Sequence, residues 1–151
     1  MCMQYLIFYI FLLPLAVLGF AQILSAFVSM ARSKHGVKAP ATTGHDQFDL
    51  TYRAHQNYLE NMVIFLPLYT IAMVILFQIG SRDMLISSLV IGCVWFVAKV
   101  LFSFAYIKSW NFKFKIAVSI ISTLANIALV GIIFYTLGVT ISAPQAQGIQ
   151  Q

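Results

Sequence analysis

The chain has 151 residues, of which 61% are hydrophobic and only 9% are charged, and its mean hydropathy is +0.90. Soluble domains carry roughly a quarter charged residues, so this chain has too few charges to cover a globule in water. This composition excludes a soluble globular enzyme, a disordered regulator and a disulfide scaffold.

Charge-free stretches of the chain mark four candidate membrane spans. All nine basic and four acidic residues lie between Arg32 and Lys115. In chain order, the predicted spans cover residues 5–31, 48–79, 84–106 and 115–137. Helices pair their backbone polar groups internally, as a bilayer requires, and these runs lack the alternation of a membrane β-barrel. The sequence therefore predicts an all-α, integral membrane four-helix bundle over residues 1–141.

The two ends of the chain receive different predictions. The first span lacks the basic leading region of a signal peptide and ends in Arg32-Ser33-Lys34, so we expect a retained helix. Residues 142–151 are polar and low in complexity, which favours a disordered tail. Cys2 and Cys93 show no metal-ligand or Cys-x-x-Cys spacing, so we expect neither a metal site nor a redox role.

The basic residues between the spans predict the orientation. Three follow the first span and three join the third to the fourth, whereas the second connection holds only Arg82 beside Asp83. These six are Arg32, Lys34, Lys38, Lys108, Lys113 and Lys115. The positive-inside rule places both basic connections in the cytoplasm and both termini on the other side of a multi-pass protein. The net charge of +5 is then a topology signal and gives no support to nucleic-acid binding.

A polar stripe opens the second span. Its members recur at spacings of three and four residues and therefore share one face of a helix: Arg53, Gln56, Asn57, Glu60 and Asn61. Ionisable groups in membrane spans are costly and tend to face a partner, a cavity or a ligand. Counting back about 20 residues, or roughly 30 Å, from residue 79 puts Glu60 where hydrocarbon meets water.

Three segments of the chain bring polar groups to this level. The same depth estimate places Arg32, Tyr106 and Lys113 there, beside the stripe of the second span. A site at this level can draw an anionic solute from the cytoplasm and an apolar one from the bilayer.

The same residues also have structural interpretations. Arg53 and Glu60 could anchor the helix at the head groups, with Asn57 joining neighbouring helices by hydrogen bonds. His55 lies roughly 200° round the helix from Arg53, which favours packing or an interface. Lys99 lies deeper in the third span, where it could snorkel to the surface or form an ion pair with Glu60.

The start of the second span also carries a recognisable motif. It reads Arg53-Ala54-His55-Gln56-Asn57-Tyr58-Leu59-Glu60-Asn61, followed by Ile64-Phe65-Leu66-Pro67-Leu68. An Arg-Ala-His-x-Asn-x-x-Glu pattern before Phe-x-Pro resembles the second helix of the MAPEG family, the membrane-associated proteins of eicosanoid and glutathione metabolism. The likeness is strongest to microsomal glutathione transferases and prostaglandin E synthase.

The resemblance implies a homotrimer of four-helix protomers that binds glutathione between neighbours at the cytoplasmic side. By motif matching, Arg53, Asn57 and Glu60 hold the carboxylates and amine of the tripeptide. His55 is implied as a contact from the next protomer. Tyr106 matches the last residue of the Arg-x-x-Tyr-x-x-x-Tyr pattern that the family favours in the third helix.

The chain departs from the family pattern in the third and fourth spans. Lys99 replaces an arginine and Phe102 a tyrosine, and a lysine is a point charge where arginine grips a carboxylate with two bonds. The arginine that activates the glutathione thiol in active members has Lys113 or Lys115 near its place. Arg32 stands where members carry a basic residue after the first helix. A nearby cation lowers the pKa of a thiol, so we expect Lys113 or Arg32 to activate it.

These features predict a membrane-bound glutathione transferase or peroxidase that acts on hydrophobic electrophiles or lipid hydroperoxides, surrounded by membrane lipids. The thiolate of glutathione attacks the substrate, and no side chain becomes covalently modified. The alternative is a non-enzymatic lipid-binding or scaffold protein of the same fold, which Phe102 and the lysine replacements favour. A proton-coupled exporter that uses Glu60 fits less well, because such a carboxylate lies near the bilayer midplane.

Overall fold

Four long helices make up the part of the chain that the structure describes. This computed structural model describes the backbone of residues 3–147 and the side chains of residues 10–139. The helices are α1 (Met3–His35), α2 (Asp46–Ile79), α3 (Arg82–Ile107) and α4 (Phe112–Gln147). Each contains a segment long and apolar enough to cross a membrane. The prediction of an all-α chain with four membrane helices is confirmed.

The fourth helix differs from its prediction at the C-terminal end. It continues to Gln147 instead of ending at residue 137, so residues 142–147 are helical, whereas the sequence favoured a disordered tail there. Four of these six residues are alanine or glutamine, which are good helix formers, and extending a helix costs much less than starting one, whereas Pro144 opposes the helix by removing one backbone N–H. The rest of the predicted tail, residues 148–151, lies outside the described residues.

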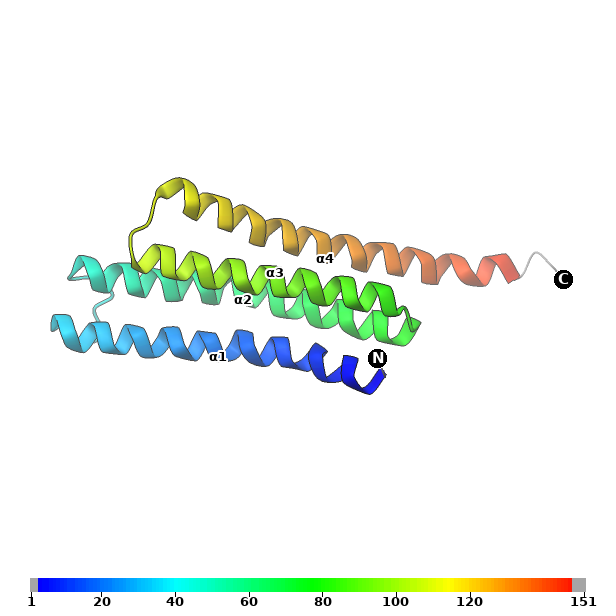
Figure 1. The fold of residues 1–151 in the computed structure, drawn as a ribbon, viewed down its shortest axis with the longest axis horizontal. Helices are drawn as coiled ribbons and strands as arrows, with labels where there is room; N and C mark the ends of the chain where they lie inside the picture. The colour runs from blue at the N-terminus through cyan, green and yellow to red at the C-terminus, as the bar shows by residue number, and fades with distance from the viewer. Residues whose placement is uncertain (1–2, 148–151) are drawn as a thin grey trace.

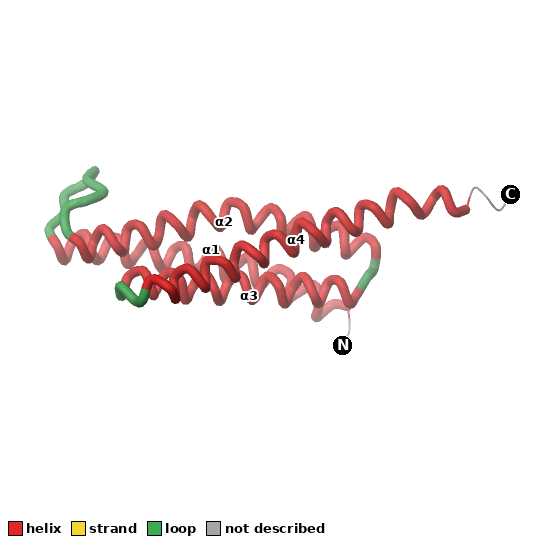
Figure 2. The backbone as a smooth tube through the Cα atoms, turned by 90° about the horizontal axis from the view of Figure 1, so that it is seen from above, coloured by secondary structure: helices red, strands yellow, loops and turns green. Residues whose placement is uncertain are grey.

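The helices α2 and α3 form an antiparallel pair at the centre of the molecule, with α1 on one side and α4 on the other (Figure 1). Within the described chain, α1 packs against α2 and α3, and α4 packs against α3 and α2, but the backbones of α1 and α4 do not approach each other closely. Gly80 adopts the left-handed conformation (φ 74°) that closes α2 and allows the tight turn into α3. The α1–α2 and α3–α4 connections lie at the end of the bundle opposite this turn (Figures 1 and 2).

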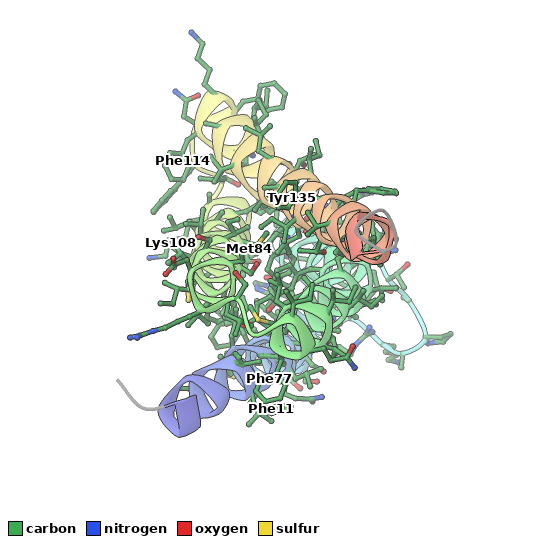
Figure 3. The ribbon with its side chains drawn as sticks, turned by 90° about the vertical axis from the view of Figure 1, so that its right-hand side faces the viewer. Phe11, Phe77, Met84, Lys108, Phe114 and Tyr135 are labelled. Atoms are coloured by element: carbon green, nitrogen blue, oxygen red, sulfur yellow. The ribbon has the colours of Figure 1, made fainter. Side chains whose placement is uncertain are left out.

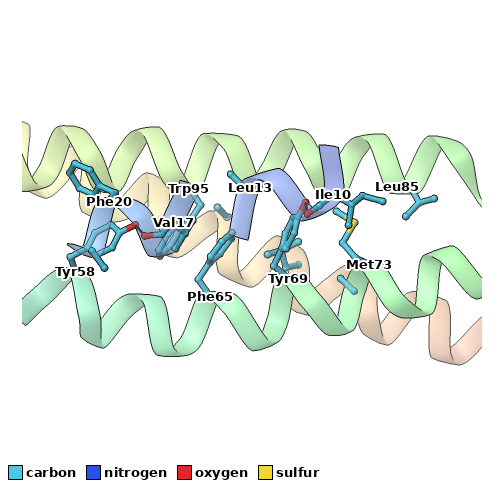
Figure 4. Close-up of a cluster of buried hydrophobic side chains, with 14 of the residues drawn as sticks. Ile10, Leu13, Val17, Phe20, Tyr58, Phe65, Tyr69, Met73, Leu85 and Trp95 are labelled. Carbon is cyan, nitrogen blue, oxygen red and sulfur yellow. Dashed lines mark hydrogen bonds between the residues drawn. The ribbon is translucent and has the colours of Figure 1, made fainter. Parts of the chain in front are cut away.

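Aromatic rings fill the space between α1, α2 and α3 (Figure 4). The rings of Phe65 and Trp95 stack with centroids 3.9 Å apart and an interplanar angle of 6°. Phe20 of α1 meets Tyr58 edge to face at 5.1 Å. Viewed along the helices, other large side chains project outward, among them the exposed Phe11 and Phe77 (Figure 3). Such an apolar exterior suits a protein surrounded by lipid.

Two tyrosines of α2 donate hydrogen bonds to the backbone of α1. The buried hydroxyl of Tyr58 donates to the Val17 carbonyl at 2.9 Å, and that of Tyr69 donates to the Ile10 carbonyl at 3.5 Å. The Ile10 carbonyl lacks its usual helical donor, because the residue four positions later is Pro14, which has no N–H. Tyr69 therefore supplies a donor where the α1 backbone is short of one.

Gly92 lies at a close approach between α3 and its neighbours. A Cβ atom at this position would lie 2.5 Å from Leu13 Cδ2 and 2.8 Å from Tyr69 Cε2. Tyr69 cannot yield easily, because its hydroxyl bonds to α1 and its ring stacks on Phe65. The absence of a side chain at Gly92 thus allows α1, α2 and α3 to meet.

We expect Gly92→Ala to lower the free energy of unfolding by about 1–3 kcal/mol, because the added methyl group must displace Tyr69 or Leu13. Denaturant titration in detergent, followed by circular dichroism, measures this loss. Gly131→Ala in α4 is the matched control, since no neighbouring atom lies within 4 Å of the added Cβ. The control should be neutral or stabilised by up to about 1 kcal/mol. Equal effects of the two changes would contradict the packing role of Gly92.

Candidate functional site

One polar pocket joins the predicted stripe of α2 to the end of α3. It has a volume of about 220 Å³ and is lined by Arg53, Gln56, Asn57, Glu60 and Tyr106. Helical spacing brings the four α2 residues to one face, as the sequence predicted. Gln56 belongs to the predicted stripe but was not among the expected binding residues.

A cross-helix hydrogen bond holds Tyr106 beside α2. Gln47 Nε2, in the first turn of α2, donates to the Ile107 carbonyl at the end of α3 at 3.0 Å. The Gln47 carbonyl in turn accepts from the Thr51 hydroxyl at 2.8 Å. The start of α2 and the end of α3 are therefore fixed relative to each other just where the pocket lies.

The pocket offers complementary charges and hydrogen-bonding groups. Arg53 and Glu60 are exposed, and Asn57 and Tyr106 are half-buried. Asn61 Nδ2 donates to the backbone carbonyl of Asn57 at 2.8 Å and contacts its Oδ1 at 3.4 Å, which leaves the Asn57 amide N–H groups available to a ligand. A guanidinium binds a carboxylate and a carboxylate binds an ammonium, so the site suits a small zwitterion.

Three predicted site residues lie outside the pocket lining. His55 is half-buried on another face of α2. Arg32 braces the α1–α2 connection: its Nη1 donates to the Ala41 carbonyl at 2.9 Å, and its guanidinium lies 4.8 Å from the centroid of the Phe48 ring. Lys113 is exposed in the first turn of α4, where its backbone N–H donates to Asn111 Oδ1 at 2.9 Å.

Lys115 is the α4 cation that lies against the pocket lining. Its Nζ is 5.1 Å from the centroid of the Tyr106 ring. Residues two positions apart point to nearly opposite sides of a helix, so Lys113 and Lys115 cannot both face Tyr106. The sequence offered both lysines as candidates, but the choice between them depends on the direction in which α4 leaves the α3–α4 turn.

Lys99 is buried inside the bundle, with 2% of its surface exposed. Its Nζ lies 5.4 Å from the centroid of the Phe102 ring, a cation–π distance. Among the described side chains, no ion pair joins Lys99 to Glu60, and its burial excludes snorkelling. Neither interpretation of Lys99 drawn from the sequence matches this arrangement.

Two further hollows are larger but almost entirely apolar. One, of about 340 Å³, lies between α1 and α2 near Pro14 and Met73. The other, of about 480 Å³, lies between α3 and α4 near Cys93 and Val118. Neither contains a charged side chain, so the smaller polar pocket is the better candidate for specific recognition.

We expect Lys99→Met to raise the free energy of unfolding by about 1–3 kcal/mol, because methionine fills similar space without burying an ammonium group. Denaturant titration of the purified protein measures the change. Lys108→Met, at the exposed C-terminal cap of α3, is the control and should change stability little. A loss of stability in Lys99→Met would instead show that an anionic group meets Lys99 in the assembled protein.

Known proteins resemble this chain over most of its length. The sequence profile of the MAPEG family matches residues 6–135. The uncharacterized protein sll1147 of Synechocystis sp. is 35% identical over 83 residues, or 54% of this chain. That match spans 55% of the relative, so the chain covers about half of its length. The resemblance carried by the second span is thereby confirmed, and the chain belongs to the MAPEG family.

Proposed function

We propose that this protein binds glutathione in the polar pocket between α2 and α3 and adds its sulfur to hydrophobic electrophiles or uses it to reduce lipid hydroperoxides. The observation that carries the proposal is the meeting of Arg53, Asn57, Glu60 and Tyr106 in one pocket of a MAPEG protein. Each group has a partner in the tripeptide. The Arg53 fork binds a carboxylate, Glu60 binds the ammonium, and Asn57 and Tyr106 donate to the remaining oxygens.

A second protomer completes the site. The pocket volume of about 220 Å³ is below the roughly 300–1,000 Å³ of typical ligand sites, so one protomer supplies part of the binding surface. In the proposed homotrimer, the exposed side of α2 packs against a neighbouring protomer, and His55 contacts the tripeptide bound in the pocket of that neighbour. Both basic connections lie at the pocket end of the bundle, which therefore faces the cytoplasm, with both termini across the membrane.

A cation at the start of α4 activates the thiol. Lys115 lies against Tyr106, and Lys113 is exposed in the first turn of α4. A positive charge beside the sulfur stabilises the thiolate, which then attacks an electrophile dissolved in the bilayer. The new C–S bond of the thioether forms as a leaving group departs, or as an activated double bond is added to and then protonated. With a lipid hydroperoxide, two glutathione molecules supply the two electrons, and the products are the alcohol, water and glutathione disulfide. Arg32 acts on this site indirectly, by bracing the α1–α2 connection.

We expect Arg53→Ala to weaken glutathione binding by about 10- to 100-fold, because a charged hydrogen-bond partner of the ligand is lost. Glu60→Gln should weaken it to a similar degree through the ammonium group. Isothermal titration of the detergent-purified protein measures both. Arg82→Ala, at the far end of the bundle, is the control and should bind like wild type. No binding by wild type, or unchanged binding by Arg53→Ala, would refute the proposed site.

The second candidate is a glutathione or lipid binder without catalysis. Two observations favour it: among the described residues Arg53 is the one cation in the pocket lining, and the apolar ring of Phe102 stands where active members carry a tyrosine.

Ultraviolet difference spectroscopy separates the two functions, because a bound thiolate has an ultraviolet absorption band that a bound thiol lacks. For the enzyme, we expect a thiolate band on addition of glutathione, no band with S-methylglutathione, and a loss of the band in Lys115→Gln. Glutathione that binds without a thiolate band would establish the binder.

A further inference from the structure

The turn between α3 and α4 is held in a fixed shape by its own hydrogen bonds. Ser109 adopts a left-handed conformation (φ 51°), and the Trp110 N–H donates to the Ala105 carbonyl at 2.9 Å. Asn111 caps the start of α4, where its Oδ1 accepts from the Lys113 N–H at 2.9 Å. The side chains that leave this turn are therefore presented in a defined arrangement.

Three large aromatic side chains of this turn remain outside the protein core. Trp110 is 43% exposed, Phe112 71% and Phe114 38%. The rings of Trp110 and Phe114 meet edge to face with centroids 5.4 Å apart. No such group occurs in the α1–α2 connection at the same end of the bundle, since residues 36–45 contain no phenylalanine or tryptophan.

Cations alternate with these aromatic rings. Lys108 and Lys113 are exposed on either side of Trp110 and Phe112, and the chain from residue 84 onward contains no acidic residue. The acidic residues nearest to the turn are those in the first turn of α2, which the bond from Gln47 to the Ile107 carbonyl holds beside the end of α3. By contrast, the lysines near the α1–α2 connection lie close in sequence to Asp46 and Asp49. A partner of the α3–α4 turn must therefore combine negative charge with an apolar body.

We propose that the α3–α4 turn is a binding site for anionic phospholipid of the surrounding bilayer. The phosphate of the head group lies against Lys108 and Lys113, while Trp110 and Phe112 enter the region where head groups meet acyl chains. Tryptophan concentrates at this boundary, and lysines near the surface attract anionic lipids. The turn differs from the α1–α2 connection in its rigid aromatic pair and in having no acidic residue in its own segment of the chain.

Quenching of tryptophan fluorescence by brominated lipids tests the proposal. The full chain is reconstituted into bilayers of phosphatidylcholine and phosphatidylglycerol, with bromines near the glycerol end of either lipid and at the same bromine content. Trp95 is fully buried, and subtracting the spectrum of Trp110→Phe isolates the Trp110 signal. We expect brominated phosphatidylglycerol to quench the Trp110 fluorescence at least about two times as strongly as brominated phosphatidylcholine does.

Matched lysine variants show whether the preference belongs to this turn. In Lys108→Gln/Lys113→Gln, both brominated lipids should quench the Trp110 fluorescence equally, because the negative head groups have lost the lysines that attract them. Lys34→Gln/Lys38→Gln removes the same charge from the other connection and should keep the preference. Equal quenching in wild type, absence of quenching, or a preference that survives the loss of Lys108 and Lys113 would each overturn the proposal.

Discussion

The hydroxyl of Tyr58, donated to the Val17 carbonyl across the α1–α2 contact, ties the first helix to the centre of the molecule. Inside a bilayer no water competes for these groups, so a polar side chain must find its partner within the protein. About three turns further along α2, the Tyr69 hydroxyl donates a similar bond to the carbonyl of α1 that Pro14 leaves without a helical donor. These two bonds and the missing side chain of Gly92 set the distance at which α1, α2 and α3 pack.

The orientation of α2 about its own axis, which buries its apolar side chains in the core, also places its polar side chains in the pocket. Ala54, Tyr58 and Phe65 face inward and are fully buried, so the residues between them turn toward the outside. Arg53, Gln56, Asn57 and Glu60 thereby share one surface and meet Tyr106. The pocket residues and the core residues belong to different faces of the same helix, and α2 cannot rotate about its axis without disrupting both.

The features that could be predicted from sequence are those that depend on local pattern. Charge-free runs predict the helices, and spacings of three and four place the α2 polar residues on one face. Contacts between helices depend on directions that spacing does not contain. Arg32 of α1 turns toward Phe48 of α2, and Lys115 rather than Lys113 of α4 meets Tyr106 of α3. Lys99 lies near Phe102 of its own helix, and the predicted contact with Glu60 of α2 is not made among the described side chains. The C-terminal segment of α4 is helical, but its polar composition is typical of a disordered tail, so the sequence did not predict a helix there.

The backbones of the outer helices α1 and α4 do not approach each other closely within the described chain, and each helix packs mainly against the α2–α3 pair. Lys115 arrives on α4, whereas every other charged group beside the pocket belongs to α2. A sliding or tilting of α4 therefore changes the positive potential at the site while the hydrogen bonds that hold α1 stay intact. The hydrogen-bonding groups of the pocket and the cation beside it therefore belong to different helices, and substitutions on α4 can change the local charge while the pocket residues of α2 and α3 stay in place.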